Sequence, residues 1–187
     1  MSTDFVEYRF SHLLKKPLRS SGKLEYRADG VLVRNVVLPS PEVTEVDGDQ
    51  VRVTRAGKPT RTLALQRAPQ LRVLLGSFRA LLEGHLTPLK QDFDVALDED
   101  AARWTLTLKP KDATLAKHLA RIEVHGNGDK PACMEALEPD GDGALTLFAA
   151  APDVKAPMPA RAELEHTCRA SKLVALPAAP GAAASTR

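Results

Sequence analysis

The sequence predicts a mainly β protein (α+β). We expect an incomplete, half-open antiparallel β-barrel of about ten or eleven strands, with a helical lid and an apolar cavity. Turn residues recur about every 8–12 positions between short apolar runs, which is typical of antiparallel strands that follow one another along the chain. Residues 69–84 instead have the helical period of about 3.6 residues. A flat open sheet of about ten strands tends to curl, so we expect the helix to close the curved sheet.

The expected strands of the first half are short and separated by turns rich in glycine, aspartate and proline. In residues 50–55, Val51 and Val53 point the same way, and their neighbours are polar. This alternation predicts a sheet with one dry face and one wet face. We expect strands over residues 5–15, 21–27, 31–38, 42–47, 50–55 and 60–66.

Residues 69–84 form the expected lid helix. Pro69 suits the first turn of a helix, and Gly84 suits the position just after its end. The apolar side chains between them recur at spacings of three and four and form a single stripe. Such a stripe either packs on a core or faces a ligand, and both readings stay open. Its members are Leu71, Leu74, Leu75, Phe78, Leu81 and Leu82.

Strands resume after this helix. Trp104, Leu106 and Leu108 alternate with polar residues, and Asp98-Glu99-Asp100 has the composition of a turn. We expect a helical turn within residues 112–118 and strands over residues 90–97, 102–109, 119–126, 130–138 and 143–150.

Length and composition fit a single domain. The chain has 187 residues, a net charge of +2 and 4% aromatic residues, which excludes a strongly basic or aromatic surface for nucleic acid. No apolar run reaches the length of about 18 residues needed to span a membrane. We expect one domain over residues 1–176, with a further element within 161–176, and a disordered tail rich in alanine and proline over 177–187.

Few residues have the pattern of a chemical site. Cys133 and Cys168 either form one disulfide or remain two buried thiols. A nucleophile at Ser20 or Ser21 with His12 as its base is a weak alternative, because no catalytic motif surrounds these residues. The histidines and cysteines lack the spacing of a zinc site, so we predict no metal, no cofactor and no enzymatic activity.

Several short motifs follow one another along residues 5–150. They are FVEYRF at residues 5–10, Lys16-Pro17-Leu18, Ser20-Ser21-Gly22, Leu24, Tyr26, Pro39, Val46-Asp47-Gly48-Asp49, Val51, Arg103-Trp104, Leu106, Leu108, Pro110, Ile122, Val124 and the Asp140–Asp142 turn. In order and spacing these motifs resemble the LolA-like outer-membrane lipoprotein carrier family (the LolA/LolB superfamily). The resemblance is strongest to the divergent branch associated with gene clusters for aryl polyene pigments such as xanthomonadin.

The resemblance implies a periplasmic carrier or chaperone that acts without covalent chemistry. Such a protein binds the acyl chains of a lipoprotein or a lipid-like cargo in an apolar cavity. It receives this cargo from an inner-membrane transporter and passes it to an outer-membrane receptor. The resemblance also implies a leader removed on export, and we expect a monomer. Two alternatives stay open: a carrier of aryl polyene lipid, and a protein-docking module of an outer-membrane assembly without lipid cargo.

The carrier reading assigns roles to particular residues. The leucine-rich stripe of residues 69–84 would line the lid. The resemblance makes Arg27, which follows the second expected strand, the candidate for cargo transfer. The candidates for the wall of the cavity are Leu24, Tyr26, Val33, Val51, Val53, Leu63, Leu65, Trp104 and Leu106.

Overall fold

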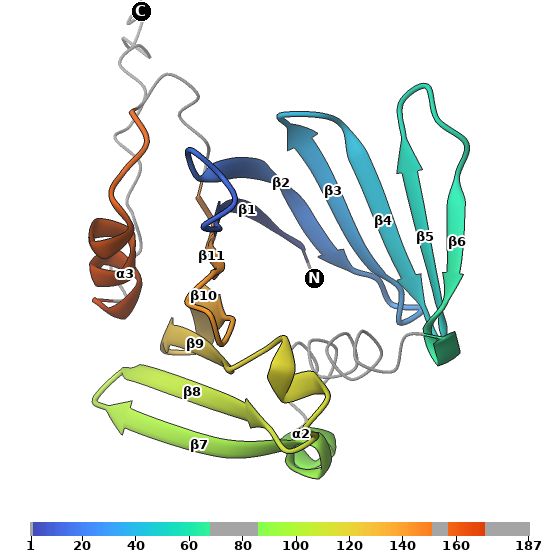
Figure 1. Cartoon of the computed structure of the whole chain (residues 1–187). Coiled ribbons are helices and arrows are strands. Elements are labelled where there is room, and N and C mark those ends of the chain that lie inside the picture. Colours follow the sequence, from blue (N-terminus) through green and yellow to red (C-terminus); the bar gives the residue numbers. More distant parts are fainter. Residues whose placement is uncertain (1, 68–85, 151–156, 171–187) are drawn as a thin grey trace, which may run out of the picture.

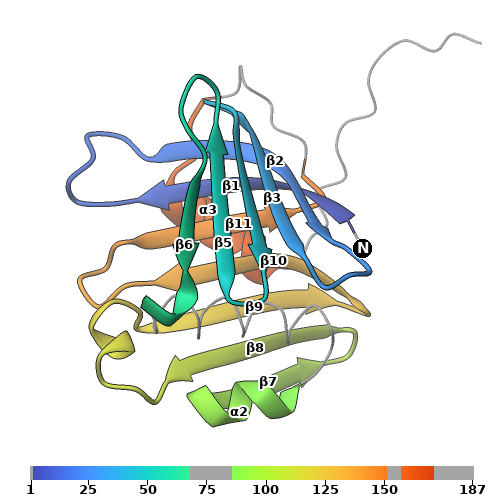
Figure 2. The same cartoon turned by 90° about the vertical axis from the view of Figure 1, so that its right-hand side faces the viewer.

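The computed structural model describes residues 2–67, 86–150 and 157–170. Within these ranges, an 11-stranded antiparallel sheet dominates the protein, which confirms the predicted mainly β class. Figure 1 shows that the sheet is strongly curved, and Figure 2 shows strands β4 to β6 standing across β9 to β11. The expected lid helix and tail lie outside the described residues, so both stay predictions.

The strands of the first half lie close to the segments in which apolar and polar residues alternate. The turns between them contain residues that favour tight backbone geometry and so end each strand. Gly30 and Gly48 have φ values of 82° and 52°, in the left-handed region that glycine adopts most easily. The strands are β1 (Ser2–Phe10), β2 (Leu18–Tyr26), β3 (Leu32–Leu38), β4 (Glu42–Asp47), β5 (Gln50–Arg55) and β6 (Arg61–Ala64).

The remaining elements complete the sheet and place short helices beside it. The further element expected within 161–176 is a helix at Arg161–Arg169. No described helix has both the length and the apolar character needed to cross a membrane. These elements are η1 (Leu65–Arg67), α2 (Leu86–Asp92), β7 (Phe93–Asp100), β8 (Arg103–Pro110), η2 (Leu115–Lys117), β9 (Arg121–Asn127), β10 (Lys130–Leu137), β11 (Gly143–Phe148) and α3 (Arg161–Arg169).

Some expected boundaries are wrong. The first strand ends at Phe10, because the Asp142 carboxylate accepts hydrogen bonds from Ser11 Oγ (2.6 Å) and from the His12 backbone N–H (2.8 Å) and so holds a turn there. Residues 86–92 are helical instead of opening a strand at residue 90. The strand β7 then runs through the acidic residues 98–100, where a turn was expected.

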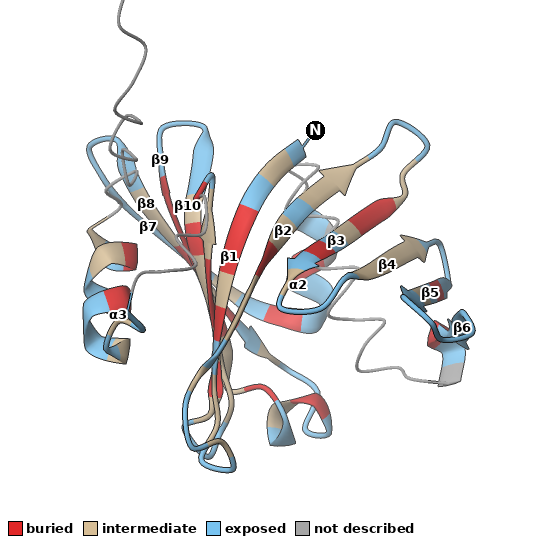
Figure 3. Ribbon diagram, turned by 90° about the horizontal axis from the view of Figure 1, so that it is seen from above, coloured by how far each residue is buried: buried red, intermediate tan, exposed pale blue. Residues whose placement is uncertain are grey.

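The order of strands brings the two halves of the chain together. The order is β6-β5-β4-β3-β2-β1-β11-β10-β9-β8-β7, so β1 pairs with both β2 and β11 at the centre. The edge strands are β6 and β7, and the sheet therefore stays open. Figure 3 shows that β6 is mainly exposed, and that buried segments occur in β1 and β3 near the centre of the sheet.

The two faces of the sheet are covered differently. The helix α3 lies on the outer, convex side (Figure 1), where Leu164 and Cys168 join Val6, Tyr8 and Leu145 in one buried cluster. The helices α2 and η2 contribute to a second cluster on the inner side, next to β7, β8 and β9. Among the described residues, the part of the inner face that no helix covers is therefore formed mainly by β2 to β6.

Candidate functional site: the inner face of the sheet

The register of the strands defines which side chains share the inner face, because directly paired residues of antiparallel strands point the same way. Across β2 to β6, one row of paired residues is entirely apolar. We call it the apolar row. Its members, in spatial order, are Tyr26, Leu32, Val46, Val51 and Leu63.

The apolar row is only partly covered. Val51 and Leu32 are buried, Tyr26 and Val46 are half-buried, and Leu63 is 52% exposed. Contiguous exposed apolar surface is a feature of ligand-binding grooves and interaction sites. The row is thus a candidate wall for a hydrocarbon ligand.

The opposite end of the inner face is filled by the protein itself. Leu106 of β8 and Val124 of β9 pack against Leu89 of α2 and Leu115 of η2. Trp104 also contacts this cluster, and its indole N–H donates to the Gly128 carbonyl at 2.8 Å. The two wall candidates on β8, Trp104 and Leu106, thus belong to a packed core rather than to an open surface.

The other wall candidates lie in three environments. Leu24 and Val53 share the inner face with the apolar row, by the same register. Leu65 is buried in η1, beyond the end of β6. Val33 pairs with Glu25 and Glu45 and lies on the outer face. Its place in the wall is therefore wrong, because it is one residue out of phase with Leu32.

Arg27 also lies on the outer side. Its guanidinium is 3.7 Å from a Glu25 carboxylate oxygen and 3.5 Å from a Glu45 carboxylate oxygen. Both glutamates flank Val33 in the register, on the same face of the sheet. The described contacts of Arg27 therefore place it on the face opposite the apolar row.

A different arginine occupies the inner face. Arg34 Nη2 is 3.0 Å from Glu7 Oε1 and 3.4 Å from Ser20 Oγ. Its guanidinium carbon lies 4.9 Å from the centre of the Phe5 ring, within range of a cation–π contact. Arg34 and Glu7 are 30% and 27% exposed, so this polar cluster, Glu7–Ser20–Arg34, is accessible beside the apolar row. It could present hydrogen-bond donors to the polar head of an apolar ligand.

Sequence reasoning missed Arg34 and Glu7. The available signal was a charged residue at an inward position among the apolar residues of β3, which is unusual for a half-buried strand. Thr146, opposite Glu7 in β11, adds a buried hydroxyl oxygen without a hydrogen-bond partner at the same place. A polar group of a ligand would satisfy it.

The expected nucleophile and base do not meet. Ser20 Oγ donates to Glu7 Oε1 at 3.4 Å, whereas His12 Nδ1 is 2.9 Å from Asp142 Oδ2 in the turn after β1. Ser21 is buried on the outer face, paired with Val6. The described contacts thus give neither serine a histidine base.

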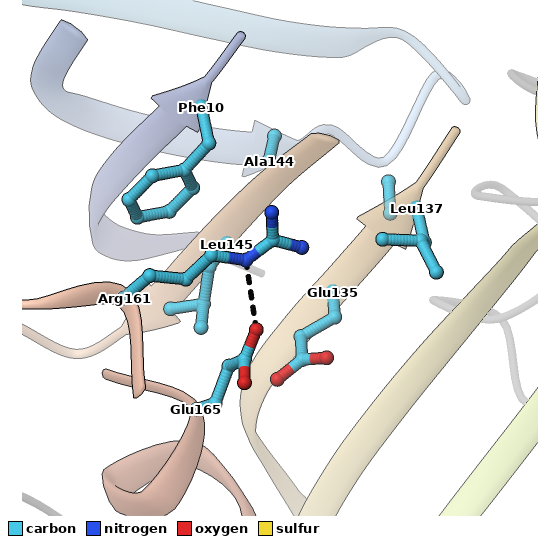
Figure 4. A pocket seen from close by; sticks show the side chains of 8 residues that line it. Phe10, Glu135, Leu137, Ala144, Leu145, Arg161 and Glu165 are labelled. Atoms are coloured by element: carbon cyan, nitrogen blue, oxygen red, sulfur yellow. Dashed lines mark hydrogen bonds and ion pairs between the residues drawn. The ribbon is translucent and has the colours of Figure 1, made fainter. Parts of the chain in front are cut away.

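A disulfide joins Cys133 of β10 to Cys168 of α3 on the outer face, with the two Cα atoms 5.6 Å apart. Beside it is a small pocket of about 10 Å³, about the room needed by one water molecule. Figure 4 shows its lining, in which Arg161 Nε donates to Glu165 Oε1 at 2.8 Å and Glu135 lies next to them. This pocket is too small for an acyl chain.

The described residues thus form a curved, open antiparallel sheet whose inner face carries the apolar row and the polar cluster beside it. A family model described as "Outer membrane lipoprotein carrier protein LolA-like" matches residues 1–171. The chain therefore belongs to this LolA-like family, whose members generally bind lipids or lipoproteins as carriers or binding proteins. Among curated proteins, none matches the sequence.

The solved structures that resemble this chain are distant in sequence, and their TM-scores are under 0.5. The LolA superfamily protein NE2245 from Nitrosomonas europaea has 8% identity and a TM-score of 0.37, over 81% of this chain and 87% of that one. The structure of MucB in complex with MucA(peri) has 18% identity and a TM-score of 0.35. The match covers 87% of this chain and 52% of the other, so this chain spans about half the length of that protein. A structure titled as the CwlD amidase from Clostridioides difficile in complex with the GerS lipoprotein has 14% identity and a TM-score of 0.43, over 83% and 86% of the two chains.

Proposed function

We propose that this protein is a periplasmic carrier that holds the acyl chains of a lipid or lipoprotein against the inner face of its sheet and passes them toward the outer membrane. The observation that carries the proposal is the apolar row of β2 to β6, in a chain that belongs to the LolA-like family. The disulfide supports an oxidising compartment, where such bonds persist.

The physical chemistry of the inner face suits a carrier. Each methylene removed from water contributes about 0.8 kcal/mol, so an acyl chain gains several kcal/mol along a row of apolar residues. Contacts of this kind have no fixed direction, so a chain can slide out when a partner offers a similar surface. The polar cluster Glu7–Ser20–Arg34 would hold the polar end of the cargo at the edge of the row.

The leucine-rich stripe of residues 69–84 would close over the cargo, with Leu75 and Phe78 near its middle. The partners proposed are an inner-membrane donor and an outer-membrane receptor, with the protein itself a monomer. The finer proposal is a cargo of aryl polyene lipid, in place of a lipoprotein anchor. Extracts of cargo-loaded protein, analysed by mass spectrometry, would distinguish a conjugated polyene from a peptide-linked lipid.

The direct test is uptake of an apolar fluorescent probe by the purified protein. We expect Leu63→Asp to reduce uptake at least tenfold, because a charge in the apolar row is costly to bury beside hydrocarbon. Leu63 is half exposed, so its substitution leaves the core intact. Leu13→Asp is the matched control, since Leu13 is 82% exposed in the turn after β1 and should leave uptake unchanged.

The alternative of a protein-docking module makes the opposite prediction. The packed cluster at β7 to β9 shows that part of the inner face is already filled by side chains. If the whole face were filled, the unaltered protein would take up no probe. That result would reject the carrier and favour docking.

A further inference from the structure

Beneath α3, on the outer face, three groups able to bind a metal converge from two paired strands and the helix. They are His125 of β9, Glu135 of β10 and Cys168 of α3, and one potential ligand atom of each lies within 4.8 Å of the others. Cys133, bonded to Cys168, is paired directly with His125 in the register of β9 and β10. These four side chains, the His–Glu–Cys₂ group, lie opposite the surface proposed for cargo.

Two polar atoms of the group are buried without hydrogen-bond partners. His125 is only 5% exposed; its Nδ1 lies 3.0 Å from Thr105 Oγ1, and its Nε2 has no hydrogen bond. Glu135 Oε1 is also buried and unpartnered. Buried polar atoms left unpaired reduce stability, so such atoms in a folded protein call for an explanation. Here both belong to the same group, within reach of one ion.

The charged residues around the group are paired with one another. Glu123 Oε2 lies 3.9 Å from His125 Nε2, and its other oxygen is 2.8 Å from Arg121 Nε. On the α3 side, Arg169 Nη2 lies 3.8 Å from Glu135 Oε2 and 4.0 Å from Glu165 Oε2. Arg161 Nε in turn lies 2.8 Å from Glu165 Oε1, so these three carboxylates are matched by three guanidinium groups, and it is the convergent ligand atoms that favour a cation.

We propose that reduction of the disulfide converts the His–Glu–Cys₂ group into a binding site for a divalent cation of the zinc type. A dithiol reductant supplies two electrons and two protons and becomes a cyclic disulfide, while the Cys133–Cys168 bond is replaced by two thiols. Each thiol releases its proton when its sulfur binds the cation, because the thiolate is the ligand form. The ion then joins two thiolates, His125 Nε2 and the Glu135 carboxylate.

The geometry needs a rearrangement of the ligand atoms. A tetrahedral zinc ion binds sulfur at about 2.3 Å and nitrogen at about 2.0 Å, which sets neighbouring ligand atoms about 3.5 Å apart. The ligand atoms of His125, Glu135 and Cys168, within 4.8 Å of one another now, would move by roughly an ångström, and the two sulfur atoms, bonded in the oxidised protein, would separate once reduced. Thr105 would accept the Nδ1–H of His125 and so fix the tautomer that leaves Nε2 free to bind. In the oxidised protein the sulfur atoms are bonded to each other and provide no thiolate.

The test compares metal binding by the oxidised and reduced protein. The chain is reduced with excess dithiothreitol, freed of it by gel filtration without oxygen, and titrated with Co²⁺ and then Zn²⁺. We expect the visible absorption of tetrahedral cobalt with a thiolate charge-transfer band in the reduced protein, and its replacement by colourless zinc. The oxidised protein should bind at least about 100-fold more weakly, as the loss of two ligands exceeds the roughly 10- to 100-fold effect of outer groups. Equal binding by both forms would overturn the proposal.

Variants separate this site from other candidates. His125→Gln and Glu135→Gln keep the disulfide, so circular dichroism of the oxidised variants checks their folding before reduction. Each should weaken cobalt binding at least tenfold, and an unchanged affinity in both would reject the site. His12→Gln is the matched control, because His12 lies near Asp140 and Asp142 in an exposed group elsewhere, and it should bind as the unaltered protein does.

A second variant keeps the test valid if reduction loosens the fold. Cys133→Ser frees the Cys168 thiol without a reductant and leaves His125 and Glu135 in place. It should bind Co²⁺ more tightly than the oxidised protein, with a thiolate charge-transfer band, and lose both when His125→Gln is added. Binding that survives the added His125→Gln change would contradict the proposal.

Discussion

Replacing Cys133 and Cys168 together by alanine should destabilise the protein by about 4 kcal/mol. The two residues are 35 positions apart, and the entropy of closing a loop of this length in the unfolded chain gives about 4 kcal/mol at 25 °C. Both residues are buried, so alanine avoids leaving a buried hydroxyl without a partner. The change also frees α3, whose Leu164 packs on the sheet next to the bond.

The assay is urea unfolding, with the midpoint and slope measured for oxidised protein, reduced protein and the double variant, all with a chelator present. We expect the reduced protein and the double variant to lose similar stability, and the reductant to have no effect on the double variant. A loss below about 1 kcal/mol in both would refute the reasoning, because the tether would then contribute far less than the loop-closure entropy predicts.

Three further changes test other parts of the structure. A Cβ added at Gly126 would overlap the indole of Trp104, so Gly126→Ala should cost about 1–3 kcal/mol and shift the fluorescence of this single tryptophan; unchanged emission would contradict the packing. The hydrogen bond from Ser11 Oγ lowers the pKa of Asp142. The ionised carboxylate therefore stabilises the fold above the usual pKa of about 4, and this stabilisation is lost as the pH falls through the lowered folded-state pKa. Asp142→Asn should remove this part of the dependence of stability on pH, and an unchanged pH profile of unfolding would contradict the assignment. For the proposed lid, Leu75→Asp should reduce probe uptake, and full uptake would reject its role.

The alternation of apolar and polar residues determined most of the sheet. Strands β3 to β5 lie close to where the pattern placed them, since their turns contain glycine, aspartate or proline at the right spacing. The same pattern could not decide which face points inward, and so Val33 was grouped with Val51 although the register separates them. Facing depends on the neighbouring strands, which local alternation does not contain.

Other features depend on contacts between distant segments. The helix α2 has only seven residues, including Pro88, and is too short a segment to show a periodic apolar stripe. The packing of Leu89 against β8 and β9 holds it in place. The acidic end of β7 has the composition of a turn, yet it pairs with β8 at the exposed edge of the sheet. Arg34 of β3 reaches Glu7 of β1 across the intervening strand β2. This ion pair depends on the order of the strands, which local sequence does not reveal.

The most direct test of the carrier proposal is photochemical cross-linking with a fatty acid that carries a photoreactive group near the end of its chain. The modified residues are located by mass spectrometry of the digested protein. The account predicts labels on the inner-face residues Tyr26, Val51 and Leu63, and their loss when an unlabelled fatty acid is added in excess. Labels confined to the outer face around Arg27 and Val33, or labels that excess fatty acid does not displace, would contradict it.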